Sequence, residues 1–135
     1  MAWGPRFDLG RVKVAVAVGN FVLGKTRAVL KIQEVVPELL RGRQFAQAVI
    51  ASLIPGDFAQ LVALEEGGEF DVYAVELSAA VLRAFNLEAQ VATWYVKLQL
   101  FDGALDDEVF VLSMHLLEYR MKRVSGVLSP RRIRS

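Results

Sequence analysis

The sequence has no cysteine, one histidine and four prolines among its 135 residues. The absence of cysteine excludes disulfides, thiolate metal sites and cysteine nucleophiles. Long apolar runs are also missing, because the longest uncharged segment, Gln44 to Gly56, has 13 residues and is too short to span a bilayer. Hydrophobic residues nevertheless make up 54% of the chain, so it can bury the core of one domain of ordinary size.

Groups that commonly act in catalysis are scarce. The single histidine, His115, lies between Met114 and Leu116 in an apolar segment, which is typical of a packed or interfacial histidine rather than a catalytic base. The acidic residues near position 106 are interpreted as helix capping rather than as a cation site. No Ser-His-Asp arrangement or metal-ligand spacing is present. The sequence therefore predicts a protein that is not an enzyme, with no catalytic residue, no metal and no cofactor.

The formal net charge of +1 hides a strong partition along the chain. Residues 1–45 carry 8 basic and 3 acidic side chains, residues 46–110 carry 2 and 11, and residues 111–135 carry 6 and 1. Two basic ends around an acidic middle indicate ends that contact a polyanion such as nucleic acid. The alternative is that the ends and the middle of different subunits neutralise each other.

The N-terminal third has three competing interpretations. Residues 19–26, Gly-Asn-Phe-Val-Leu-Gly-Lys-Thr, match the phosphate-loop pattern and predict a small nucleotide hydrolase, although the bulky Phe21-Val22-Leu23 interior is unfavourable for it. The alternating valines from Val12 to Val18 favour a strand or hairpin within 11–35, in an α+β interaction module that dimerises. Steps of 3 and 4 instead predict one helix over 6–34 with a face of small and basic residues. That face comprises Arg6, Gly10, Lys13, Ala17, Asn20, Gly24, Arg27, Lys31 and Glu34.

Three further segments are predicted to be helices. Pro37 and Pro55-Gly56 bound a helix over 38–54, and polar residues in steps of 3 and 4 predict a second over 76–97. Acidic residues at the start and basic residues at the end predict a third over 106–124. The predicted fold is therefore all-α, with a basic helical arm over 1–54, a helical bundle over 55–126 and an extended basic tail over 127–135.

The basic side chains of the arm are the predicted binding residues. Because contacts to phosphate carry no sequence information, such binding is independent of sequence and sensitive to salt. The predicted DNA phosphate contacts are Arg6, Arg11, Lys13, Lys25, Arg27, Lys31, Arg41 and Arg43, with further tail contacts from Arg131, Arg132 and Arg134.

The chain resembles the major coat proteins of rod-shaped and filamentous archaeal viruses with linear double-stranded DNA. The similarity lies in its size, in the small and basic arm beginning Met1-Ala2-Trp3-Gly4, and in residues 92–96 and 102–106, which look like a helix–turn–helix junction. The resemblance implies that helical arms of paired identical or homologous subunits wrap double-stranded DNA. It also implies a structural capsid protein without a membrane span, found in a helical filamentous virion that is assembled in the host cytoplasm.

Overall fold

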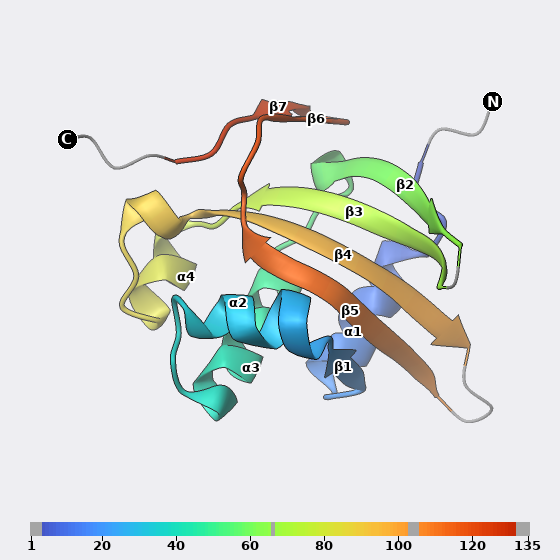
Figure 1. Ribbon diagram of the computed structural model, residues 1–135, viewed down its shortest axis with the longest axis horizontal. Helices are drawn as coiled ribbons and strands as arrows, with labels where there is room; N and C mark the ends of the chain where they lie inside the picture. The colour runs from blue at the N-terminus through green and yellow to red at the C-terminus, as the bar shows by residue number, and fades with distance from the viewer. Residues whose placement is uncertain (1–3, 66, 103–105, 132–135) are drawn as a thin grey trace.

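A computed structural model describes residues 4–65, 67–102 and 106–131 and shows an α+β fold (Figure 1). Its main sheet has the strand order β1-β5-β4-β3-β2, with β1 parallel to β5 and the other neighbours antiparallel. A separate hairpin pairs β6 with β7. The strands are β1 (Phe21–Leu23), β2 (Phe58–Leu64), β3 (Gly68–Glu76), β4 (Thr93–Asp102), β5 (Asp107–Leu116), β6 (Met121–Arg123) and β7 (Gly126–Leu128).

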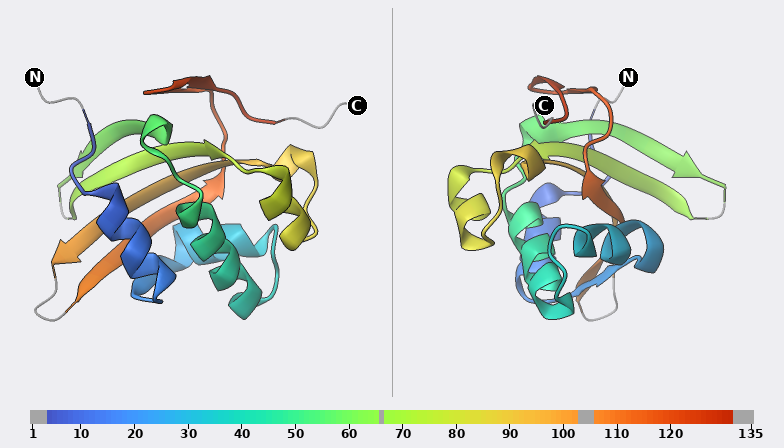
Figure 2. Two further views of the ribbon diagram at one scale, coloured as in Figure 1. Left: turned by 180° about the vertical axis from the view of Figure 1, so that it is seen from behind. Right: turned by 60° about the vertical axis from the view of Figure 1, so that its left-hand side comes forward.

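Most of the helices cover one face of the main sheet, which we call the inner face, while one lies beside β5. The α-helices are α1 (Leu9–Ala17), α2 (Leu30–Gln33), α3 (Leu39–Ala51) and α4 (Ala79–Ala84). A π-helical turn, η1 (Lys25–Val29), runs into α2, and two 3-10 turns are η2 (Pro55–Asp57) and η3 (Ala89–Val91). Figure 2 shows α1 and α3 in front of the sheet when the molecule is seen from behind. None of the helices formed by the described residues is long and apolar enough to cross a membrane.

The alternation of side chains along β4 explains why this segment is a strand. Trp94, Val96 and Leu98 are almost fully buried on the inner face, and the ring of Trp94 lies 5.0 Å from that of Phe45 in α3. Tyr95 points to the opposite side, which we call the outer face, and is only partly buried. A period of two places aromatic and branched residues on one packed face, as a half-buried strand requires.

The prediction of an all-α fold is wrong. The predicted helix over 106–124 is β5 followed by β6, and the predicted helix over 76–97 contains the end of β3, α4, η3 and the start of β4. The predicted single helix over 6–34 is divided into α1, β1, η1 and α2, so only Phe21–Leu23 is a strand within 11–35. The physical reason is pairing: β4 and β5 satisfy their backbone groups with each other, an option that neither segment reveals alone.

The predicted division into arm, bundle and tail does not separate structural units. Val12 and Phe45 from the first segment share one buried core with Val96 and Val111 from the second, and β1 pairs with β5. Residues 127 and 128 of the predicted tail belong to β7 of the β6–β7 hairpin, which packs on the outer face. Residues 1–3 and 103–105, which contribute to the coat-protein resemblance, and the tail residues Arg132 and Arg134 lie outside the described residues.

Candidate functional site

Five of the eight predicted phosphate contacts are engaged in contacts that hold the fold together. Arg11 contacts the carboxylates of Asp102 and Asp107 at 2.5 to 2.9 Å, and Arg6 lies 3.5 Å from Glu69. The predicted tail contact Arg131 likewise pairs with Glu76. These guanidinium groups connect the chain ends to the main sheet.

Lys13, Arg41 and Arg43 bond to backbone carbonyl groups. Lys13 Nζ donates to the carbonyl of Leu53 at 2.8 Å, and Arg41 donates to that of Ala84. Arg43 donates to the carbonyls of Gly19 and Phe21 at 3.0 and 3.1 Å and lies over the Phe21 ring. The cationic groups of these side chains therefore have structural partners. Of the three predicted contacts that remain, Lys31 forms an ion pair with Glu34 at 3.7 Å.

The other three predicted phosphate contacts lie on η1 and α2. They are Lys25, Arg27 and Lys31. The phosphate-loop pattern over 19–26 does not form an open loop here, because its middle residues form β1, paired to β5. The N–H of Gly24 donates to the carbonyl of Val111 at 2.8 Å instead of facing a free space. This geometry does not favour the nucleotide-hydrolase interpretation.

A hollow of about 260 Å³ lies between this helical segment and the outer face of β4 and β5. Cross-strand pairing places Tyr95 opposite His115 and Lys97 opposite Ser113, with a bulge after Lys97. Side chains directly opposite each other share one face of a sheet, so these four gather at one place. The full lining is Arg27, Lys31, Tyr95, Lys97, Ser113, His115 and Glu118.

Positive charge dominates the hollow. Arg27, Lys31 and Lys97 face a single carboxylate, that of Glu118. Burial and, to a lesser extent, the charge of Arg27 lower the pKa of Lys97, while burial raises the pKa of Tyr95. Within the part of the chain that the structure describes, neither Arg27 nor Lys97 forms an ion pair. Two clustered cations that have no ion-pair partner of their own are suited to bind an anion.

Aromatic side chains continue the hollow into a second one. The rings of Tyr95 and His115 are stacked, with centroids 4.6 Å apart and planes 11° from parallel. The same two rings also line a second hollow of about 400 Å³, which includes Glu118 and the 76% exposed Tyr119. Its lining is Gln60, Tyr95, His115, Leu117, Glu118, Tyr119 and Met121. We call the two hollows together the outer-face groove, which is cationic at one end and aromatic at the other.

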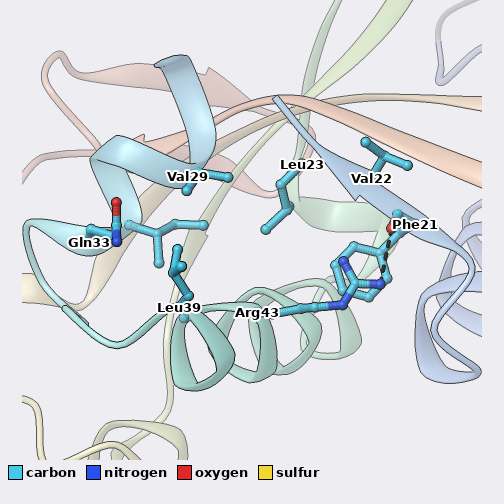
Figure 3. Close-up of a pocket in the computed structure, with 9 residues that line it drawn as sticks. Phe21, Val22, Leu23, Val29, Gln33, Leu39 and Arg43 are labelled. Atoms are coloured by element: carbon cyan, nitrogen blue, oxygen red, sulfur yellow. Dashed lines mark hydrogen bonds between the residues drawn. The ribbon is translucent and has the colours of Figure 1, made fainter. Parts of the chain in front are cut away.

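A separate pocket of about 350 Å³ lies among β1, α2 and α3 (Figure 3). Its lining is mainly apolar, with Phe21, Leu23 and Leu39 facing the space and Gln33 at one side. The guanidinium of Arg43 is turned to the Phe21 carbonyl and stacks 3.7 Å from the ring centroid. Because this cation already has partners, the outer-face groove offers the stronger site for a charged ligand.

Sequence reasoning found Arg27 and Lys31 but missed most of the groove. Tyr95, Lys97, Ser113 and Glu118 were not predicted as site residues, and His115 was interpreted as packed or interfacial. The sequence did contain one indication of these residues, the alternation of apolar and polar or aromatic side chains in 93–102. There the buried Trp94, Val96 and Leu98 alternate with the partly exposed Tyr95 and Lys97. That signal indicates a strand but not the strand that pairs with it.

Comparison of the chain with protein-family models, curated proteins and solved structures finds no match. The function is therefore inferred from the outer-face groove alone.

Proposed function

We propose that the protein binds single-stranded nucleic acid in the outer-face groove. The observation that carries this proposal is the continuity of the cationic hollow with the aromatic one. Proteins that bind single strands combine positive side chains along the phosphates with aromatic rings on which bases stack. Arg27, Lys31 and Lys97 supply the charges, and Tyr95 and Tyr119 supply the rings.

The aromatic part of the groove favours a single strand over a duplex. Tyr119 is largely exposed, and the Tyr95–His115 stack borders both hollows. Bases within a duplex are stacked on each other and hide their faces, whereas unpaired bases can be splayed onto a protein ring. The rings of the groove are therefore of use only to an unpaired strand.

Packaging of double-stranded DNA in a virion stays a prediction from the resemblance. The structure lacks the helical arm over 1–54 on which that prediction depends, and five of its eight phosphate contacts have structural partners. The outer-face groove therefore supports single-strand binding better than it supports wrapping of a duplex.

Fluorescence anisotropy with a labelled 12-nucleotide DNA strand, an RNA strand and the matching duplex tests the proposal. We expect both single strands to bind more tightly than the duplex at 50 mM salt, and affinity to fall steeply as salt rises. Arg27→Ala and Lys97→Met each remove a charge and should weaken binding about tenfold, since a hydrogen bond to a charged group contributes about 1.5 kcal/mol or more.

Arg83→Ala is the matched control. Arg83 is an exposed arginine on α4 that lines neither hollow of the groove. Its replacement by alanine removes one positive charge, as Arg27→Ala does. Binding by this variant should stay within twofold of the parent protein. Equal losses for Arg27→Ala and Arg83→Ala, or tighter binding of the duplex, would contradict the proposal.

A further inference from the structure

We propose that the outer-face groove also cleaves RNA, with His115 accepting the proton of a 2′-hydroxyl and Lys97 protonating the departing 5′-oxygen. This inference rests on the proposed binding of single strands, and it differs from the prediction that the chain is not an enzyme. Its basis is the juxtaposition of a histidine with a free ring nitrogen, a half-buried lysine and two further cations in one hollow.

The surroundings of His115 fix which ring nitrogen is a base. Nδ1 lies 2.8 Å from the carbonyl oxygen of Leu116, and a carbonyl only accepts, so the proton of the neutral ring resides on Nδ1. The lone pair is then on Nε2, for which the described residues provide no hydrogen-bond partner. Glu118 Oε1 lies 3.4 Å from Nδ1 and stabilises the charge that the ring acquires when Nε2 takes up a proton.

Lys97 is placed to act on the other side of a phosphate. It is the diagonal cross-strand neighbour of His115, because His115 pairs with Tyr95 and Lys97 pairs with Ser113. Diagonal neighbours on one face are separated by roughly 7 Å, and both side chains line the same hollow, so both can reach one phosphate bound there. Burial and Arg27 lower the pKa of Lys97, so its ammonium gives up a proton more readily than an exposed lysine does.

Arg27 and Lys31 line the same hollow from η1 and α2. Attack on a phosphodiester concentrates negative charge on the oxygens of the phosphorus, and fixed cations stabilise that charge most in the transition state. Lys31 Nζ also forms an ion pair with Glu34 at 3.7 Å, whereas Arg27 has no ion-pair partner among the described residues. The two cations therefore have a catalytic use beyond binding the strand.

The step needs no co-reactant. The 2′-oxygen forms a bond to the adjacent phosphorus while the bond from phosphorus to the 5′-oxygen breaks. The 2′-hydroxyl proton moves to His115 Nε2, and a proton of Lys97 moves to the 5′-oxygen. The products are a 2′,3′-cyclic phosphate and a 5′-hydroxyl, nothing is oxidised or reduced, and exchange with water restores both side chains. DNA has no 2′-hydroxyl and should be bound but not cut.

The test uses the full chain with a labelled RNA strand and the same strand carrying 2′-deoxyribose at every position. Mass spectrometry of the products should show 2′,3′-cyclic phosphate ends. His115→Gln and Lys97→Met should each slow cleavage at least about 100-fold, the usual range for loss of a general acid or base. Because His115 lines the groove, the affinity of His115→Gln for the deoxy strand is measured alongside, and cleavage should fall at least about tenfold more than binding does. Arg83→Ala, purified in parallel, should cut at the parent rate.

Rescue distinguishes a chemical role from a structural one. His115→Ala leaves a space beside the hollow, and added imidazole should restore cleavage at least tenfold without changing binding of the deoxy strand. Undiminished cleavage by His115→Gln, or RNA that is bound but never cut, would overturn this inference and leave the proposed binding intact. Failure to bind either strand would overturn both.

Discussion

The ion pair between Arg123 and Asp57 joins the β6–β7 hairpin to η2, the turn that leads into β2, and its removal should destabilise the protein strongly. Arg123 Nη1 lies 3.0 Å from Asp57 Oδ1, and these side chains are only 14% and 8% exposed. Burial raises the pKa of Asp57, while the N–H of Ile54 and the charge of Arg123 oppose that rise. The variant Arg123→Met keeps an unbranched chain of similar length but leaves the carboxylate without its cation.

Protonation of Asp57 limits the cost of this substitution. Removing one partner of a buried pair typically costs about 3–5 kcal/mol, because the other charge stays buried. A carboxyl of ordinary pKa 3.8 can avoid that penalty by taking up a proton. This uptake costs about 4 kcal/mol at pH 7 and about 1.6 kcal/mol at pH 5, at 1.36 kcal/mol for each pH step. The electrostatic loss is therefore about 3–4 kcal/mol at pH 7 and below about 2 kcal/mol at pH 5.

Urea unfolding followed by tryptophan fluorescence at the two pH values measures both losses. Removal of the Arg123 charge raises the folded-state pKa of Asp57 further in Arg123→Met. The folded variant therefore holds a proton that the unfolded chain releases, so its free energy of unfolding falls as pH rises above 3.8. The double variant Asp57→Asn/Arg123→Met should be more stable than Arg123→Met alone at pH 7. A loss for Arg123→Met that is equal at pH 5 and pH 7 would refute this explanation.

Two further substitutions test the packing at β5 and at the N-terminal segment. A Cβ added at Gly24 would lie 2.8 Å from the carbonyl oxygen of Leu112, so Gly24→Ala should lower the free energy of unfolding by roughly 1–3 kcal/mol. Gly4→Ala, where nothing lies within 4 Å, should be neutral in the same thermal or urea assay, and equal effects would contradict the steric reason. Asp71 is fully buried and accepts the N–H groups of Arg6 and Phe7, and burial raises its pKa above 3.8. As pH rises from 3.8, the parent protein should therefore lose stability relative to Asp71→Asn, which cannot ionise at this position. A difference in free energy of unfolding that stays constant between pH 4 and 6 would disprove that the raised pKa of Asp71 affects stability.

Local punctuation predicted one helix well. The predicted helix over 38–54 corresponds to α3, Leu39–Ala51. Pro37 precedes the first turn, where a missing N–H costs nothing, and Pro55-Gly56 cannot continue the helix. These constraints act within a few residues, so they are visible in the sequence without knowledge of the fold.

Tertiary pairing made the second half of the chain unpredictable from local patterns. The acidic start and basic end of 106–124 imitate the charges of a capped helix. In the structure, Asp107 pairs with Arg11 from α1, and Arg123 pairs with Asp57. The same charges thus form contacts between segments distant in sequence. The segment is a strand because β-forming residues such as Val109 and Val111 pack in the core.

The position of the groove was equally hidden. Arg27 and Lys31 come from a helical edge of the sheet, while Tyr95 and His115 meet only because β4 and β5 pair in one register. A shift of that register by one residue would move every outer-face side chain to the core. Since register depends on packing of the whole sheet, sequence spacing alone could not bring these residues together.

The charge partition along the chain has an intramolecular explanation. Arg6, Arg11 and Arg131 from the basic ends pair with Glu69, Asp102, Asp107 and Glu76 from the acidic middle. The ends and the middle therefore neutralise each other within one subunit, so the partition by itself does not indicate a polyanion. Lys97 is an exception to this pairing of basic and acidic side chains. It is one of two basic residues in the acidic middle, and among the described residues it shares its hollow with Arg27 and Lys31 instead of forming an ion pair of its own. Burial and the charge of Arg27 both lower the pKa of Lys97, so the groove disfavours its charged form, as expected at a site where a bound anion would offset that effect.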